Sequence, residues 1–124
     1  MTDAWTVDFV DEFRAEFRDL SPPVRAAILA KAGLLRRFGP ELQRPHADTL
    51  HGSRHANMKE LRFAADAGEW RVAFAFDPDR KAIVLVAGDK SGMPSRRFYR
   101  RLIRIADRRF EHHLARLPTE GPQR

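Results

Sequence analysis

The chain has 124 residues, of which 43% are hydrophobic, and it carries a formal net charge of +6. This length and composition predict a single compact domain with its own core, and they argue against a disordered chain. The chain contains no cysteine, which excludes disulfide bridges and thiolate metal sites. Because no apolar stretch is long enough to cross a bilayer and the N-terminus lacks signal-peptide features, we expect a cytoplasmic protein without membrane contact.

The positive charge is concentrated near the C-terminus. Residues 1–90 hold 14 Lys and Arg against 14 Asp and Glu, whereas residues 91–124 hold 9 Arg against 3 acidic residues. A segment this basic favours a polyanionic or acidic partner. The alternative is that arginine serves only as a solubilising cation.

The first third of the chain predicts a short strand and two helices. Trp5–Asp8 alternates apolar and polar residues, as a strand does, and residues 9–20 then show apolar side chains at helical spacing. The Ser-Pro-Pro sequence at 21–23 ends this helix and begins a second one, because serine is a good N-cap and proline is tolerated in the first turn. Gly-Pro at 39–40 ends the second helix.

Three strands are predicted in the middle of the chain, after a polar loop. Residues 41–57 show little periodicity and predict a loop, with one helical turn over Glu41–Arg44. The strands are Met58–Phe63, Glu69–Phe76 and Lys81–Ala87, separated by short turn-like segments. Connections this short imply antiparallel neighbours.

The last predicted element is a helix from Pro94 to about Leu114. Its apolar stripe consists of Tyr99, Leu102, Ile103, Ala106, Phe110 and Leu114. We therefore expect an α+β fold in which a small antiparallel sheet, made of the N-terminal strand and a three-strand meander, packs with two N-terminal helices and one C-terminal helix. Residues 1–117 form the domain and residues 118–124 a frayed tail.

Three cations stand where buried strands usually carry none: Arg62, Arg71 and Lys90. A buried charge costs several kcal/mol unless it is paired, so these residues suggest an anion site in which Arg62 and Arg71 clamp one phosphate. Lys90 lies in the sequence GDKSG, whose glycines let backbone amides approach an anion, although the full phosphate-loop motif is absent. The alternative is ordinary ion pairing with Glu60, Glu69 or Asp89.

Other candidate groups lie in the loop and in the last helix. His51 and His55 have the spacing of a helical metal site, but Gly52 argues against a helix, so no metal is expected and proton transfer is the more useful role. Tyr99 fits the apolar stripe, which favours core packing over catalysis. A basic ridge suited to phosphates runs along the same helix, with a solvated face as the alternative: Arg96, Arg97, Arg100, Arg101, Arg104 and Arg108.

The segments KELRF, EWRVAFAF, AIVLVAGDKSG and RRFYRRLIRIADRRFEHHL resemble, in their order and spacing, the phage Gp49-like branch of the RelE/HigB toxins of type II toxin–antitoxin systems. The likeness covers nearly the whole chain. It implies a RelE-like fold and a metal-independent mRNA endonuclease, often ribosome-dependent, that needs no cofactor. It also implies a cognate helix-turn-helix antitoxin as partner.

The resemblance also assigns residues. Arg62 and Arg71 match arginines of the RNA-binding face, and Lys90 matches a lysine after the last strand, so these three are the expected catalytic residues. Proton transfer is left to His51, His55 or Tyr99, because the GDKSG segment departs from relatives and no catalytic tyrosine or histidine aligns. Further RNA contacts are expected from Arg96, Arg97, Arg100 and Lys59, although strand alternation places Lys59 on the face opposite Arg62.

Two other functions remain open at this stage. A ParE-like toxin of similar fold would inhibit DNA gyrase by protein contact, using the last helix. A non-catalytic module would hold nucleic acid on the basic ridge without cutting it.

Overall fold

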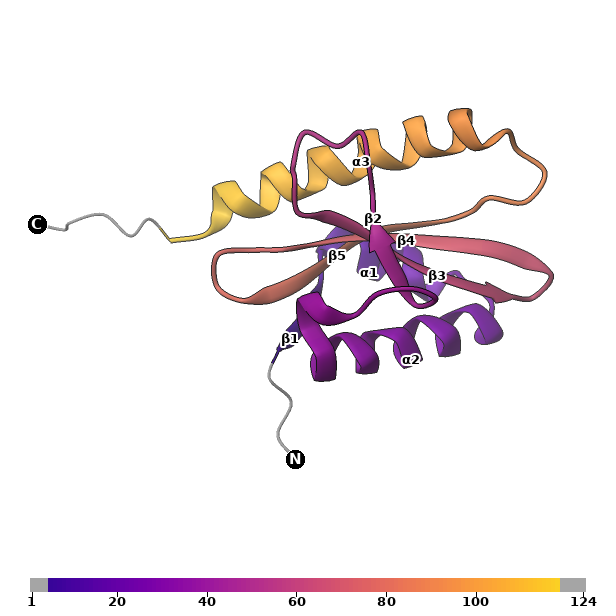
Figure 1. Ribbon diagram of the computed structural model, residues 1–124, viewed down its shortest axis with the longest axis horizontal. Helices are drawn as coiled ribbons and strands as arrows, with labels where there is room; N and C mark the ends of the chain where they lie inside the picture. The colour runs from indigo at the N-terminus through magenta and orange to yellow at the C-terminus, as the bar shows by residue number, and fades with distance from the viewer. Residues whose placement is uncertain (1–4, 119–124) are drawn as a thin grey trace, which may run out of the picture.

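A five-stranded sheet with helices on both faces forms the domain in the computed structural model, which describes residues 5–118. The sheet order is β1-β5-β4-β3-β2. Helix α3 crosses one face of the sheet, and α2 runs along the opposite face (Figure 1). The elements are β1 (Thr6–Phe9), α1 (Asp11–Arg18), α2 (Pro22–Phe38), η1 (Gly39–Glu41), β2 (Ala47–Thr49), β3 (Met58–Ala65), β4 (Gly68–Phe76), β5 (Lys81–Asp89) and α3 (Ser95–Arg116).

The two N-terminal helices form where the sequence predicts them. Ser21 has extended backbone angles and stands at the N-cap of α2, with proline in the first turn. Val24, Ile28 and Leu35 recur on one side of α2 and are fully buried. At the other end Gly39 has a φ of 56°, and the ring of Trp5 fills the space that a Cβ atom would need. Glycine therefore ends α2 and admits the N-terminal strand.

The central meander is confirmed, whereas two parts of the sheet differ from the prediction. Strands β3, β4 and β5 pair antiparallel, as predicted. However, β1 pairs parallel with β5, so the sheet is mixed, and β2 lies inside the segment predicted to be a loop. A three-residue strand shows no usable periodicity, and the choice of partner for β1 depends on residues more than 70 positions away in the chain. The predicted helical turn at Glu41–Arg44 is instead the 3-10 turn η1.

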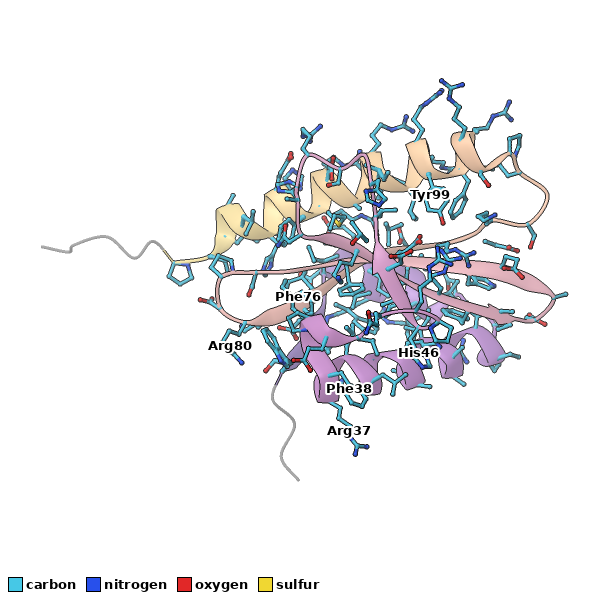
Figure 2. The ribbon with its side chains drawn as sticks, in the orientation of Figure 1. Arg37, Phe38, His46, Phe76, Arg80 and Tyr99 are labelled. Atoms are coloured by element: carbon cyan, nitrogen blue, oxygen red, sulfur yellow. The ribbon has the colours of Figure 1, made fainter. Side chains whose placement is uncertain are left out.

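Helix α3 closes the face of the sheet that carries the predicted site. Its buried residues Phe98, Leu102, Ala106 and Phe110 recur at every fourth position and cover β4 and β5. Tyr99 stands beside this stripe, between the helix and the sheet (Figure 2), and is only partly buried. The predicted frayed tail, apart from Pro118, lies outside the described residues.

Candidate active site

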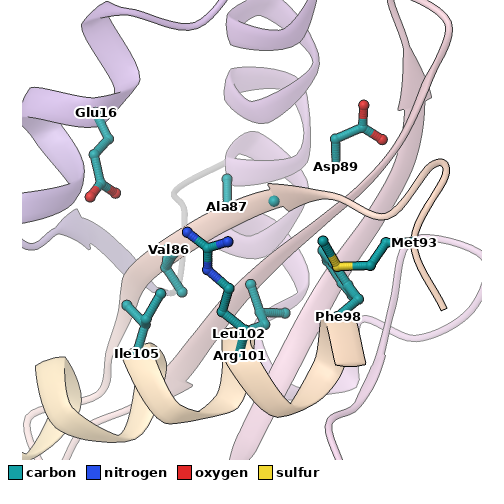
Figure 3. A pocket seen from close by; sticks show the side chains of 10 residues that line it. Glu16, Val86, Ala87, Asp89, Met93, Phe98, Arg101, Leu102 and Ile105 are labelled. Carbon is teal, nitrogen blue, oxygen red and sulfur yellow. The ribbon is translucent and has the colours of Figure 1, made fainter. Parts of the chain in front are cut away.

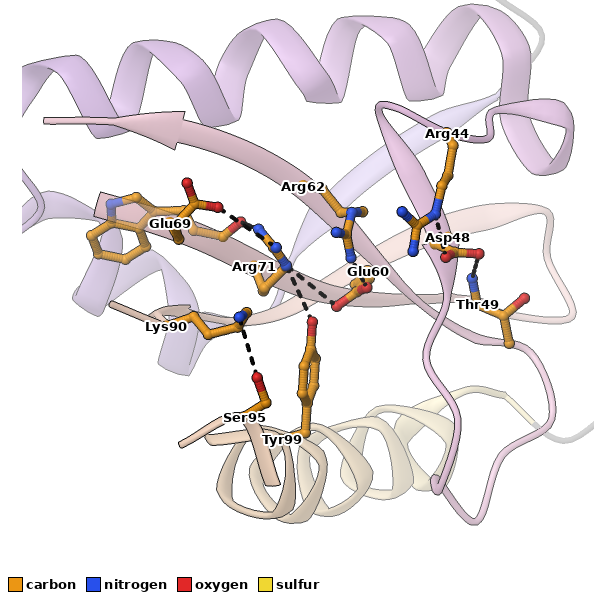
Figure 4. A network of polar contacts seen from close by, with 11 residues as sticks. Arg44, Asp48, Thr49, Glu60, Arg62, Glu69, Arg71, Lys90, Ser95 and Tyr99 are labelled. Atoms are coloured by element: carbon orange, nitrogen blue, oxygen red, sulfur yellow. Dashed lines mark hydrogen bonds and ion pairs between the residues drawn. The ribbon is translucent and has the colours of Figure 1, made fainter. Parts of the chain in front are cut away.

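Two arginines lie directly opposite each other on neighbouring strands. Arg62 of β3 is in register with Arg71 of β4, so both side chains leave the same face of the sheet (Figure 4). Arg71 is buried; its Nε donates to the hydroxyl of Tyr99 at 3.1 Å and its Nη1 donates to the carbonyl of Trp70 at 2.9 Å. The side chain of Arg62 is 22% exposed. The predicted cross-strand placement is confirmed, and one guanidinium group is held rigidly while the other reaches solvent.

A buried carboxylate, Glu60, stands between these arginines. Its Oε2 lies 2.7 Å from Nη1 of Arg62, so the ion pair considered as an alternative for Arg62 exists. Its Oε1 is 4.0 Å from Nε of Arg71 and, within residues 5–118, has no hydrogen-bond partner although it is buried. A buried carboxylate oxygen that stands beside the hydroxyl of Tyr99 and is reached by Arg71 only at 4.0 Å is a candidate proton acceptor. Sequence reasoning treated Glu60 only as a counter-ion, because nothing in the sequence shows that one oxygen stays free.

Tyr99 brings a hydroxyl group from α3 into the cluster. Burial raises the pKa of Tyr99, and the nearby Glu60 carboxylate acts in the same direction, whereas Arg71 opposes the shift. The phenol is therefore neutral at neutral pH and can donate a hydrogen bond. The sequence predicted core packing for this residue; the ring does pack against the core, but the hydroxyl joins the polar cluster.

Lys90 lies in the turn between β5 and α3. Its Nζ donates to Oγ of Ser95 at 3.3 Å, and no ion pair with Asp89 is found in the part of the chain that the structure describes. Asp89 instead accepts hydrogen bonds from the backbone amides of Glu69 and Ser91, and the Ser91 amide is the main reason that the pKa of Asp89 is lowered. Asp89 thus shapes the turn, while the lysine remains available to an anion.

The two histidines of the loop have different surroundings. His51 is exposed and lines a hollow of about 320 Å³ together with Glu60, Arg62 and Tyr99. His55 instead packs edge-on against Phe110, with ring centroids 5.0 Å apart, and its Nε2 lies 3.1 Å from a carboxylate of α3. Only His51 is near the arginines.

The loop that carries His51 is tied to α3 by side chains of the Gly-Ser-Arg segment. The hydroxyl of Ser53 and the backbone amide of Arg54 donate to the buried carboxylate of Asp107. The guanidinium of Arg54 also binds Glu111 in a bidentate pair, at 2.9 and 2.8 Å. These contacts of Ser53 and Arg54 with α3 position the neighbouring His51 over the sheet.

The predicted RNA-binding residues lie outside the cluster. Lys59 is partly buried on the other face of the sheet and lines a separate hollow near Phe38, as strand alternation predicted. Arg96, Arg97 and Arg100 are exposed on α3. Their role in RNA binding stays a prediction.

A hollow of about 350 Å³ lies on the other flank of α3 (Figure 3). It is lined by Glu16, by the second half of β5 and by α3 residues that include Arg101. None of the paired arginines lines it, so this hollow is separate from the cluster. Strand β1 pairs with Lys81–Val84, so beyond Val84 the outer edge of β5 has no strand partner among residues 5–118.

Within residues 5–118, no group of three or more His, Asp or Glu side chains is arranged to hold a metal ion. None of the helices in this part of the chain is long and apolar enough to span a membrane.

A model of the family described as phage derived protein Gp49-like (DUF891) matches residues 15–111. The chain belongs to this family. This Gp49-like protein is 40% identical over 121 residues to the putative toxin HigB2 of Mycobacterium tuberculosis, a match that covers 97% of the chain and 59% of the relative. It is 43% identical over 99 residues to the putative toxin HigB3 of the same organism, covering 80% of the chain and 84% of that relative. The chain thus spans less than two thirds of the length of HigB2.

Solved structures show the same fold. A mutant of the E. coli toxin RelE in the free state superposes with a TM-score of 0.57 at 14% identity, covering 83% of this chain and 95% of that one. A chain of the archaeal RelE–RelB complex from Pyrococcus horikoshii gives a TM-score of 0.53 at 16% identity, covering 74% of this chain and 99% of that one. These structures confirm the expected RelE-like α+β fold, whereas the family model and the two HigB relatives confirm the expected family relationship.

Proposed function

We propose that this Gp49-like protein is the toxin of a type II toxin–antitoxin pair, and that it cuts mRNA in the cytoplasm by attack of a 2′-hydroxyl on the adjacent phosphate. The observation that carries the proposal is the cluster on one face of the sheet, where two opposed arginines flank a buried carboxylate whose second oxygen has no close hydrogen-bond partner among residues 5–118. The printed names of the curated relatives, both putative toxins, support it.

The cluster offers a group for each part of this reaction. Arg62 and Arg71 can bind the phosphate and stabilise the charge that grows on its oxygens. Neither can act as a base, because arginine does not lose its proton in proteins. Oε1 of Glu60, which Nε of Arg71 approaches only to 4.0 Å, is a suitable acceptor for the proton of the attacking 2′-hydroxyl, and acid–base groups of this kind need no metal.

The leaving 5′-oxygen needs a proton donor. His51 lines the same hollow as Glu60 and Arg62, and a histidine can donate a proton near neutral pH. Tyr99 stays protonated because its pKa is raised, so we assign it to hydrogen bonding of the phosphate. Lys90, in the turn before α3, serves as an additional cation at the edge of the arginine cluster. His55 is assigned to loop packing because its ring is held against α3.

The proposed partner is a cognate antitoxin, which in this branch is commonly a helix-turn-helix protein. One structural neighbour is a RelE bound to its RelB, which supports a partner of this kind. The exposed arginines of α3 suit an acidic segment of the antitoxin when the toxin is neutralised, and RNA or the ribosome when it is free.

Induction of the protein in growing cells, followed by mapping of transcript 5′ ends, tests the proposal. We expect growth arrest with new transcript ends for the wild type, and neither effect for Arg62→Gln. Arg18 is exposed on α1 and lies outside both the arginine cluster and the basic ridge of α3, so Arg18→Gln provides the control and should behave as the wild type. Cleavage of RNA by the purified protein alone should persist in EDTA, whereas cleavage of mRNA on ribosomes is measured with Mg²⁺ present because EDTA dissociates ribosomes.

Growth arrest with intact transcripts would refute the proposed nuclease activity. If the purified protein then inhibited supercoiling by gyrase, inhibition of gyrase, as by ParE-like toxins, would be the function instead. RNA binding without arrest or cleavage would indicate a non-catalytic module.

A further inference from the structure

A second hollow lies on the other side of Arg62 and has the same size as the first. The hollow that contains His51 measures about 320 Å³, and so does the neighbouring one, which is lined by Pro45, Phe63, Ala64, Glu69 and Arg71. These volumes are at the lower end of the range for small-molecule sites, which begins at about 300 Å³. Each hollow can therefore take one small unit, such as a nucleotide, rather than an extended ligand.

Two arginines, Arg44 and Arg62, line both hollows and form the wall between them. Arg44 comes from the segment before β2, and the structure brings it over β3, where the backbone amide of Arg62 donates to the carbonyl of His46 at 2.9 Å. A wall of two cations between two equal hollows matches the chemistry of one phosphodiester with a nucleotide on each side. Aromatic residues line both sides, Tyr99 and His51 in one hollow and Phe63 in the other.

Arg44 is held in a contact that an anion can replace. Its Nε lies 2.8 Å from Oδ2 of Asp48, and the two side chains are 64% and 36% exposed. The hydrogen bond from Arg44 is the largest cause of the lowered pKa of Asp48, and the charge of Arg62 adds a smaller effect. Exposed pairs of this kind contribute about 0–1 kcal/mol, whereas an arginine can bind a phosphate through two parallel hydrogen bonds. A phosphate can thus compete with Asp48 for the guanidinium group of Arg44.

We propose that Arg44 is a phosphate-binding residue that joins the two hollows into one dinucleotide site, and that Asp48 occupies it when no RNA is bound. Arg44 holds the phosphodiester from the side opposite Arg71, and one nucleotide of the step lies in each hollow. Asp48 competes with the phosphate for the guanidinium group. The proposal rests on the proposed RNA-cleaving function, to which it adds the size of the recognised unit.

Binding of an uncleavable RNA tests this site. The probe is a short fluorescent RNA with a 2′-deoxynucleotide at the cleavage position, and affinity is measured by anisotropy at several salt concentrations. We expect Arg44→Gln to weaken binding about 10-fold, as for loss of a hydrogen bond to a charged group, and to lower the salt slope by about 0.7. Asp48→Asn should strengthen binding about 3-fold or more, because a competing charge is lost.

A matched ion pair elsewhere on the surface provides the control. Arg14 and Asp8 lie 3.8 Å apart with side chains 54% and 47% exposed, near the start of the chain and outside both hollows. Arg14→Gln and Asp8→Asn make the same charge changes there and should alter affinity by less than about 2-fold. A dinucleotide should bind measurably tighter than a nucleoside monophosphate, as seen by NMR titration.

The outcomes separate this inference from the nuclease itself. If Arg44→Gln binds as Arg14→Gln does, or if a mononucleotide binds as well as the dinucleotide, the inference is overturned while cleavage can still occur. If the variants behave as expected but the wild type cuts no RNA, the dinucleotide site stands and the nuclease does not. A wild type that binds an acidic peptide at this wall, but no RNA, overturns both.

Discussion

Replacement of Glu60 by glutamine should separate RNA cleavage from RNA binding. The side chain is 5% exposed, and it has one oxygen on Arg62 and one without a partner among residues 5–118. Glutamine has the same shape and can keep the hydrogen bond to Arg62, but it carries no charge and is a far weaker proton acceptor. The substitution thus removes the proposed base while the two arginines stay in place.

The expected effects have opposite signs. Loss of a general base lowers the cleavage rate by about 10²- to 10⁴-fold. Binding of an uncleavable RNA should become tighter, because a phosphate about 6 Å from the carboxylate is repelled by about 2–3 kcal/mol at an effective dielectric constant near 20. Since Arg62 is partly exposed, solvent screening reduces this to about 1 kcal/mol, which corresponds to roughly 5-fold in affinity.

The assay pairs single-turnover cleavage of a labelled RNA with anisotropy of its 2′-deoxy counterpart, and circular dichroism confirms folding. Glu69→Gln is the control, because this carboxylate lies 3.8 Å from Nη2 of Arg71 but is 59% exposed. It removes the same charge at the rim and should change cleavage by less than about 5-fold. A folded Glu60→Gln protein that cleaves RNA as fast as Glu69→Gln does would refute the role of Glu60 as base.

Two further predictions concern the scaffold of the site. Arg109 donates to the buried carbonyl of Leu85 at 2.8 Å and to both oxygens of Glu16. Arg109→Met should therefore lower the free energy of unfolding, measured by urea titration, by about 2–3 kcal/mol. The control Arg108→Met, at an exposed position, should change this free energy by less than about 0.5 kcal/mol. An equal effect of both substitutions would contradict this. Asp89→Asn should destabilise the turn before α3 only while the wild-type carboxylate is ionised. Folding lowers the pKa of Asp89 from 3.8, so the difference in unfolding free energy between the two proteins should be complete above pH 3.8. This difference should disappear as the pH falls through the lowered pKa. A difference that persists in acid would show that charge is not its cause.

Some features of the site could be predicted from the sequence because they depend on neighbouring residues. A turn of a few residues between apolar runs sets the pairing of β3 with β4, so Arg62 and Arg71 were expected to be adjacent and are directly opposite. Strand alternation likewise predicted that Lys59 faces away from them. The parallel partner of β1 and the existence of β2 could not be found in this way, since each depends on long-range pairing.

The sequence by itself determined the helices, the meander and the face on which the two arginines stand, because each of these follows from side-chain periodicity and short turns. Only the tertiary structure decided which other groups join them. Packing of α3 across the sheet brings the hydroxyl of Tyr99 to Arg71, 28 residues away, and the loop anchored on α3 brings His51 rather than His55 to the cluster. Packing also leaves one oxygen of Glu60 without a close hydrogen-bond partner among residues 5–118, and this depends on every neighbour in space, which no local sequence pattern records.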